Sequence, residues 1–247
     1  MAVTHRDPVL STRRQRGRAS AIEEIKAAAL DELRRHGASG VTMRGVARAI
    51  DMTPSGLYRY FDDHGALLAA LSVDAHDSLS EALEAARGGF PEDDCRSRWF
   101  RGSLVLRAWA LDHVDEYALV VGPRLPGVDA DHPDLVLAST RLMSHPTAIV
   151  AEAIAGGDLV PGPVSLAMSR TASNVPGGRQ VGPVAVRGIT IGAVSALAGL
   201  VSLEAFGHLP GDLEDLEEYY RTYSLAIMRT MGFADLPHAQ GRLLSAS

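Results

Sequence analysis

The chain has 247 residues, of which 46% are hydrophobic and 22% are charged, and its formal net charge is −6. This composition is typical of a soluble globular protein with one large domain or two smaller ones. The single cysteine, Cys95, excludes an internal disulfide and a cysteine-based zinc site, and no apolar run follows the N-terminal arginines as it would in a signal peptide. We therefore expect a cytoplasmic protein.

The charge is unevenly distributed along the chain. Residues 1–64 carry 11 basic and 8 acidic side chains, a net charge of +3, whereas the remainder carries 13 and 22, a net charge of −9. A basic segment of this kind is either an ordinary solvated surface or a nucleic-acid-binding surface. Charge alone leaves both interpretations open.

Apolar spacing, capping residues and glycine stops predict four helices near the N-terminus. Thr42 has the residue type that caps a helix, and Thr53 followed by Pro54 suits the start of another. Residues 1–20 show no apolar periodicity and are expected to form a flexible basic arm. The predicted helices cover residues 22–36, 42–50, 53–61 and 66–87.

The rest of the chain keeps the helical period, and no alternating strand pattern competes with it. We therefore predict an all-α fold. Prolines and glycines concentrate in residues 157–187, which indicates a long irregular connection. The further predicted helices cover residues 92–112, 114–121, 133–156, 188–206 and 212–231.

The uncharged run at residues 188–203 raises the question of a membrane span. It has sixteen residues, fewer than the roughly 20 needed to cross a bilayer, and Glu204 ends it. A helix buried in a core or in a subunit interface is the favoured interpretation.

The spacing from Met43 to Tyr60 is that of a helix-turn-helix. A small residue, Ala47, stands where two helices would cross, and Leu57 and Phe61 are four residues apart on one face of the second helix. The helical step leaves the other face exposed, and in a helix-turn-helix that face enters the major groove. This exposed face contains Ser55, Gly56, Arg59 and Tyr60, with Tyr58 towards one flank.

The stretch AAALDELRRHGASGVTMRGVARAIDMTPSGLYRYFDDHGALLAAL resembles the tetracycline-repressor (TetR) family of bacterial transcription regulators. The shared pattern is a helix that ends in glycine, Thr-x-x-x-(Ile/Val)-Ala, and Gly-Leu-Tyr-x-(Tyr/His)-Phe followed by Leu-Leu. The resemblance implies a homodimer that binds double-stranded DNA, with a phosphate contact from Thr42 and a base or phosphate contact from Arg44. The implied reading surface consists of Thr53, Pro54, Ser55, Gly56, Tyr58, Arg59 and Tyr60.

Two positions depart from the family pattern. Asp51 replaces a turn glycine, which aspartate tolerates because it visits left-handed backbone geometry more readily than most residues. His64 replaces a phosphate-binding lysine, so the contact there is expected to be weaker. The basic arm can supply positive charge along the phosphates or in the minor groove through Arg13, Arg14, Arg16 and Arg18, although a solvated tail is the alternative.

The C-terminal part resembles the ligand-binding half of the TetR subgroup described by a Trp-His-Gly motif, although the literal motif is not intact. The resemblance implies an all-helical half that dimerises through its last two helices. Two apolar stripes agree with this and predict interface residues Leu197, Leu200, Val201, Phe206, Tyr220, Tyr223 and Ile227. A mixture of bulky and polar-tipped side chains predicts a small-molecule pocket, lined by Trp99, Phe100, Leu104, Trp109, His113, Tyr117, Leu142 and Met143.

These patterns together predict a ligand-responsive repressor that is released from its operator by a small apolar or amphipathic effector. The predicted domains are the arm at 1–20, the DNA-binding domain at 21–65 and the ligand-binding and dimerisation domain at 66–247. An activator or a ligand-independent DNA-binding protein of the same fold is the alternative. An enzyme is not expected because nucleophile-elbow, phosphate-loop and zinc-helix motifs are absent, and no metal, cofactor or membrane partner is predicted.

Overall fold

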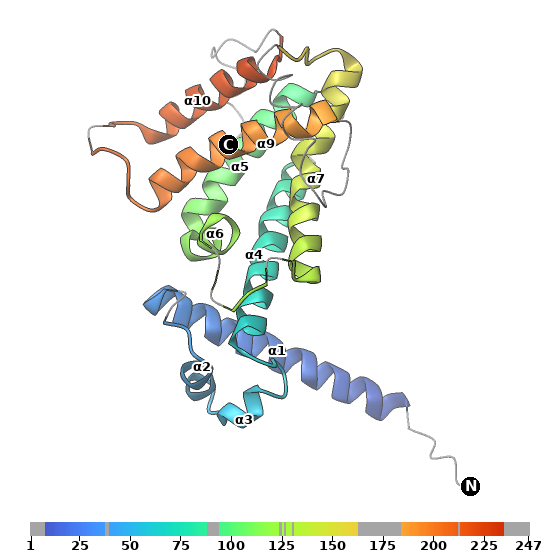
Figure 1. Cartoon of the computed structure of the whole chain (residues 1–247), viewed down its shortest axis with the longest axis vertical. Coiled ribbons are helices and arrows are strands. Elements are labelled where there is room, and N and C mark those ends of the chain that lie inside the picture. The colour runs from blue at the N-terminus through green and yellow to red at the C-terminus, as the bar shows by residue number, and fades with distance from the viewer. Residues whose placement is uncertain are drawn as a thin grey trace. The chain divides into compact units, whose positions relative to one another are not determined.

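The computed structural model describes residues 8–37, 40–87, 94–123, 125, 127–129, 131–162, 184–211 and 213–234. Helices are its regular elements, as Figure 1 shows, and the predicted all-α fold is confirmed. In chain order they are α1 (Pro8–His36), α2 (Met43–Ala49), α3 (Pro54–Leu57), α4 (His64–Arg87), α5 (Cys95–Asp112), α6 (Val114–Val121), α7 (Pro133–Gly156), α9 (Val184–Ala205) and α10 (Leu216–Met231).

The chain divides into two compact units. The first contains Met1–Ala75 and Asp115–Leu137, and the second contains His76–Val114 and Ala138–Ser247. This division differs from the predicted domain boundary at residue 65. The first half of α4 and the segment that begins with α6 belong to the first unit, called the head below, because their apolar residues complete its core.

The core of the first unit joins α1 to α2, α3 and α6, which are too short to be stable alone. In α1, Ile25, Ala29 and Leu33 recur at four-residue spacing and are almost fully buried. These residues pack against the buried residues of the neighbouring helices. This packing holds α2 against α1, and α3 against α2. The other core members include Val46, Leu57, Phe61, Leu67, Leu68, Leu71 and Leu119.

Helix α1 is longer than the sequence pattern predicted. The flexible arm expected over residues 1–20 is wrong for residues 8–20, which are helical. Pro8 occupies the first helical position, where its missing N–H costs nothing. Apolar periodicity is absent from this part of the sequence because residues 15–20 are exposed, and an exposed helix needs no buried stripe.

The second unit is organised around α5, which packs against α9 and α10. The hydroxyl of Tyr220 donates a hydrogen bond to the carbonyl of Ser103 over 2.9 Å, and the guanidinium of Arg107 donates two hydrogen bonds to the Glu204 carboxylate at 2.5 and 2.8 Å. The side chains of Arg107 and Glu204 are only 16% and 9% exposed, so each neutralises a partner that would be costly to bury alone.

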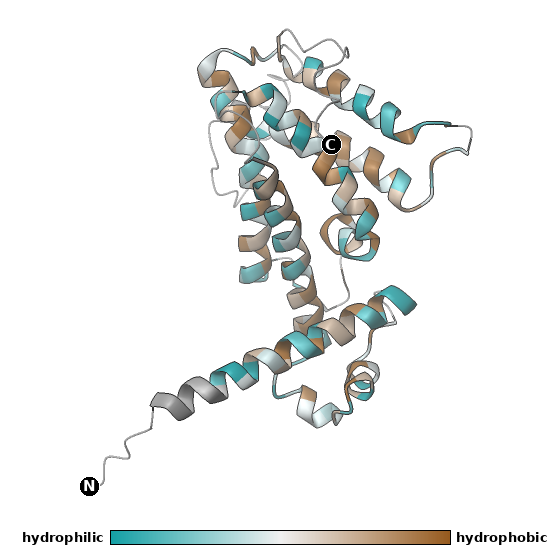
Figure 2. Cartoon of the chain, turned by 180° about the vertical axis from the view of Figure 1, so that it is seen from behind, coloured by the Kyte–Doolittle hydropathy of each residue, from teal (hydrophilic) through white to brown (hydrophobic). Residues whose placement is uncertain are grey.

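Helix α9 begins at Val184, four residues before its predicted start, and residues 163–183 of the predicted 157–187 connection lie outside the described residues. In the described part of the chain, one helical segment, Val186–Ala205, is long and apolar enough to span a membrane, judged by length and composition alone. Figure 2 shows much of α9 in brown or pale tones, whereas hydrophilic and hydrophobic residues alternate along α10. The buried residues of α9 form part of the second unit's core.

Candidate DNA-binding site

Two threonines define where the helices of the helix-turn-helix begin. Thr42 has extended backbone geometry, and its hydroxyl accepts a hydrogen bond from the amide of Gly45 at 3.0 Å. Thr53 does the same for the amide of Gly56 at 3.1 Å, and Pro54 occupies the first position of α3. Each hydroxyl caps its helix by accepting from an amide of the first turn, and the Thr53 hydroxyl also lies 3.2 Å from the Ser55 hydroxyl.

Asp51 makes the turn between α2 and α3 possible. Its φ of +51° is in the left-handed region, and in the described part of the chain no other non-glycine residue has a positive φ. The turn closes through a 2.8 Å hydrogen bond from the amide of Met52 to the carbonyl of Ala47. The expectation that aspartate replaces the usual glycine in left-handed geometry is confirmed.

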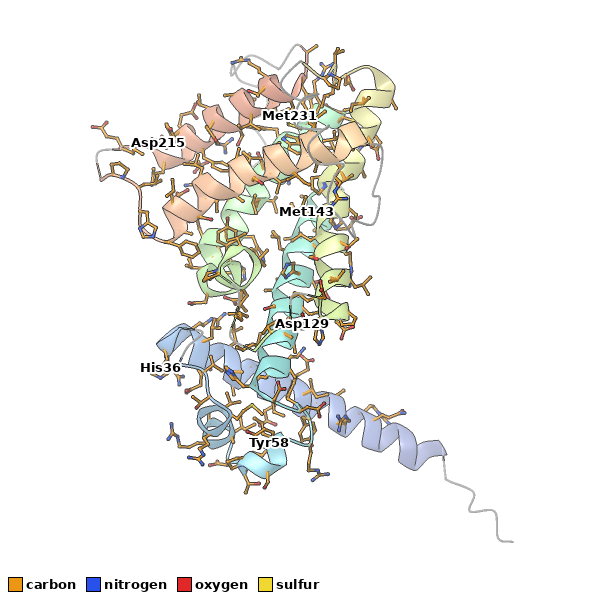
Figure 3. The ribbon with its side chains drawn as sticks, in the orientation of Figure 1. His36, Tyr58, Asp129, Met143, Asp215 and Met231 are labelled. Carbon is orange, nitrogen blue, oxygen red and sulfur yellow. The ribbon has the colours of Figure 1, made fainter. Side chains whose placement is uncertain are left out.

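Helix α3 has one face inside the head and one in solvent. Leu57 is fully buried and Phe61 is 8% exposed, whereas Tyr58, at the C-terminal end of α3, is 49% exposed. Figure 3 labels Tyr58 at this position. Tyr60 is half-buried, and the other exposed residues between positions 42 and 60 are Thr42, Arg44, Arg48, Ala49, Asp51, Thr53, Pro54, Ser55 and Arg59.

This exposed surface combines guanidinium groups with hydroxyl groups. Both kinds of group donate hydrogen bonds to phosphate oxygens, and arginine also pairs with the guanine edge in the major groove. Arg48 has the same exposure as Arg44, although sequence reasoning did not select it. Arg48 lies in the last turn of α2, and no position of the family pattern marks this residue as a DNA contact.

Gly56, predicted to lie on the reading surface, also has a packing role in the turn. A Cβ atom on Gly56 would lie 3.0 Å from Cγ of Met52 and 3.2 Å from Oγ1 of Thr53. The missing side chain therefore makes room for the turn and the helix cap, on the inner side of α3.

The predicted phosphate contact of His64 also needs correction. His64 opens α4, and Asp63 caps that helix by accepting a hydrogen bond from the amide of Ala66 at 2.8 Å. Nε2 of His64 is buried and has no hydrogen-bond partner among the described residues. This nitrogen faces the protein, so it cannot take the place of an exposed lysine ammonium.

The N-terminal extension of α1, residues 8–20, carries the predicted arm arginines. Arg16 and Arg18 are exposed, whereas the side chains of Arg13 and Arg14 lie outside the described residues. Nη1 of Arg18 donates a hydrogen bond to the carbonyl of Arg59 at 3.1 Å. The Arg18 guanidinium also lies over the ring of Tyr60, 5.3 Å from its centroid.

Two basic residues of α1, Lys26 and Arg34, form ion pairs within the first unit. The ammonium of Lys26 lies 2.7 Å from a carboxylate oxygen of Asp74 and 2.8 Å from one of Glu23. Burial alone would lower the pKa of Lys26, but its hydrogen bonds to both carboxylates raise the pKa above its ordinary value. Arg34 pairs with Glu116 at 2.6 Å and so ties α1 to α6 within the first unit.

The predicted pocket residues are distributed over both units. Tyr117 is fully buried and belongs to the first unit, whereas the other seven belong to the second. In the second unit the His113 ring stacks on Trp109 with centroids 5.1 Å apart, and Nε1 of Trp109 donates to the Ser78 hydroxyl at 3.2 Å. Nε1 of Trp99 is buried without a hydrogen-bond partner among the described residues. Trp99, Phe100 and Leu142 are buried, and Leu104 and Met143 are half-buried.

The predicted dimer residues also divide into two groups. Leu197, Val201 and Tyr220 are at most 2% exposed within one protomer, so their prediction as contacts to a second copy is wrong. They follow the apolar stripe that packs inside the second unit. Phe206 is 37% exposed, and Leu200, Tyr223 and Ile227 are half-buried. Leu203, on the same apolar stripe of α9, is 45% exposed, and the exposed large apolar residues of α9 and α10 that sequence reasoning missed are Ile191 and Tyr219.

Two family descriptions match separate parts of the chain. Residues 25–71 match the family described as "Bacterial regulatory proteins, tetR family", which covers the helix-turn-helix. Residues 99–223, just over half of the chain, match "Tetracyclin repressor-like, C-terminal domain".

Similar proteins extend over most of the chain. The HTH-type transcriptional regulator Rv1816 from Mycobacterium tuberculosis is 29% identical over 79% of this chain and 87% of its own length. A protein of unknown function from Rhodococcus sp. RHA1 has a similar structure, with a TM-score of 0.66 and 26% identity over 85% of this chain and 95% of that one. A tetR-family regulatory protein from Rhodococcus RHA1, 20% identical over 87% and 98% of the two chains, shares the fold with a TM-score of 0.61.

Proposed function

Since the chain belongs to the TetR family of bacterial transcriptional regulators, which are DNA-binding proteins rather than enzymes, we propose that it is a cytoplasmic repressor. It binds a palindromic or pseudopalindromic operator as a homodimer, and a small apolar or amphipathic effector releases it. The residues that read the operator lie on α3 and in the turn that follows it, with Arg44 at the edge of the groove. The resemblance to the Trp-His-Gly subgroup remains a prediction about the effector-binding half.

The two faces of α3 carry the proposal for DNA binding. Leu57 is buried in the head's core, while Ser55 before it and Tyr58 and Arg59 after it are exposed. A helix held on one side and lined with donors on the other fits the major groove. The buried side gives the helix a fixed orientation, so the donors need little ordering on binding.

To test DNA binding, the wild-type protein first selects duplexes from a random-sequence pool. A gel shift then compares its affinity for a selected duplex with its affinity for the DNA flanking its own gene. Arg44→Ala and Tyr58→Ala should each weaken binding to the selected duplex about tenfold. Asp134→Ala, an exposed change in the first turn of α7, serves as a control and should leave the affinity unchanged. Failure to select any sequence would refute specific DNA binding.

The homodimer follows from the size of the reading surface. One short helix covers one half-site, and a twofold dimer presents two such helices to half-sites related by the same symmetry. We assign the second copy to the exposed apolar face of α9 and α10, which includes Leu203, Phe206 and Tyr219. Leu203→Glu should convert the dimer to a monomer in light scattering, whereas Ser195→Glu at an exposed polar position of α9 tests whether any added charge has this effect.

The effector is proposed to bind in the second unit near Trp99. The buried indole N–H of Trp99 has no partner among the described residues and is therefore a donor for an acceptor on an apolar ligand. To change DNA occupancy from 99:1 to 1:99, the ligand must favour the released state by about 5.5 kcal/mol. Lipophilic compounds that quench tryptophan fluorescence in the wild type and in Trp109→Phe, but not in Trp99→Phe, would support this site.

The direction of regulation is a separate outcome. A compound bound near Trp99 should release the selected duplex in the gel shift if the protein is a ligand-released repressor. Bound compounds that leave DNA affinity unchanged would favour a ligand-independent regulator, and transcription that falls when the gene is deleted would favour an activator.

A further inference from the structure

The N-terminal extension of α1 lacks the usual source of helix stability. Residues 15–20 are exposed, so the extension buries no apolar stripe there, and Gly17 lies inside it. Glycine in a helix interior costs about 0.5–1 kcal/mol relative to alanine. This part of α1 therefore depends on side-chain contacts to the rest of the head.

Arg18 makes two such contacts, both to the segment that follows α3. Its Nη1 donates a hydrogen bond to the carbonyl of Arg59 at 3.1 Å, and its guanidinium lies 5.3 Å from the centroid of the Tyr60 ring. Arginine can make both contacts at once because its planar group stacks on an aromatic ring while its N–H donors remain directed outward. A lysine ammonium would keep the charge but lose this combined geometry.

We propose that Arg18 is a positioning residue that sets the orientation of Tyr60 for DNA binding and fixes the N-terminal extension as a rigid helix beside the reading surface. The proposal rests on the DNA-binding function proposed above. It replaces the interpretation of Arg18 as a phosphate contact on a flexible arm, since its guanidinium is directed towards α3 and the residues after it. Arg18 acts through Tyr60 and does not itself read DNA.

The local backbone explains why Tyr60 needs such support. Helix α3 ends at Leu57, and the chain continues through turn residues whose amides bond back to it, including Tyr60 to the Leu57 carbonyl at 2.9 Å. This is the end of a four-residue helix, with few hydrogen bonds to hold it. A side chain that bonds the Arg59 carbonyl and covers the neighbouring ring restrains both the backbone and the aromatic group.

The first test uses the free protein and requires no DNA. In Arg18→Ala, amide hydrogen exchange should become at least threefold faster at Tyr60 and Phe61 and across residues 15–20. Ser20→Ala is the control, since residue 20 is exposed on the same helix about 200° around its axis from Arg18. Unchanged exchange at Tyr60 in Arg18→Ala would overturn the proposal.

The second test measures the affinity for the duplex selected by the wild-type protein in a double-mutant cycle. Arg18→Ala should weaken binding five- to tenfold in the wild-type background and less than twofold in Tyr60→Ala. The slope of log K against log salt should stay unchanged, since a phosphate contact would contribute about 0.9 to that slope. Equal losses in both backgrounds together with a shallower slope would identify a direct phosphate contact and refute positioning.

A third variant tests whether the extension acts as a helix. A Cβ on Gly17 would meet no atom within 4 Å, so Gly17→Ala strengthens the helix without a clash. It should preserve or tighten DNA binding and slow exchange over residues 15–20. Weaker binding by Gly17→Ala would show that a flexible arm is required. If the wild type selects no duplex, the proposed function fails, while the exchange experiment still decides whether Arg18 orders Tyr60.

Discussion

Leu57→Ala tests the attachment of α3 to the head. Leu57 is fully buried and is the buried residue of α3, so its side chain is the principal anchor of that helix. Removing a buried leucine side chain costs about 3 kcal/mol in transfer and cavity terms. For a chain of this size, that loss corresponds to a melting temperature lower by about 6–12 °C.

Thermal unfolding followed by circular dichroism measures this change, with Leu137→Ala as the matched control. Leu137 has the same side chain but is 56% exposed, so its removal should shift the melting temperature by about 2 °C or less. Leu57→Ala should also lose specific DNA binding at a temperature where it remains folded, because α3 is no longer held in one orientation. Equal melting temperatures for the two variants would show that Leu57 does not anchor α3.

Three further predictions concern other contacts. Gly65→Ala should destabilise the first unit by about 1–3 kcal/mol, measured by urea unfolding, since its Cβ would clash with the Gly127 backbone. Arg107→Met should cost about 3 kcal/mol by leaving Glu204 buried without its partner, and an unchanged urea midpoint would refute the pairing. Burial, the largest influence, raises the pKa of the Cys95 thiol, so its reaction with a disulfide reagent should remain slow at neutral pH and accelerate only in alkaline solution or on unfolding.

Much of the DNA-binding head could be predicted from local patterns. Thr42, Thr53 and Pro54 mark where α2 and α3 begin, and the four-residue spacing of Leu57 and Phe61 identifies the buried side of α3. These features depend on interactions within a few residues, and a single sequence displays them directly. The exposure of Tyr58 and Arg59 follows from the same helical geometry.

Long-range packing decided what the pattern could not. An apolar stripe on α9 or α10 shows that a face is buried but not which surface covers it, so Leu197 and Tyr220 were predicted at a dimer interface although they pack inside the protomer. The inward direction of Gly56 and the burial of Nε2 of His64 depend on neighbours brought together by folding.

The sequence by itself determined the helical class and the helix-turn-helix, because caps, helical periodicity and turn residues act over short distances along the chain. Only the tertiary structure decided that the N-terminal extension is helical and that Arg18 contacts Arg59 and Tyr60. Those contacts join residues more than forty positions apart, and no periodicity records which distant side chains will meet.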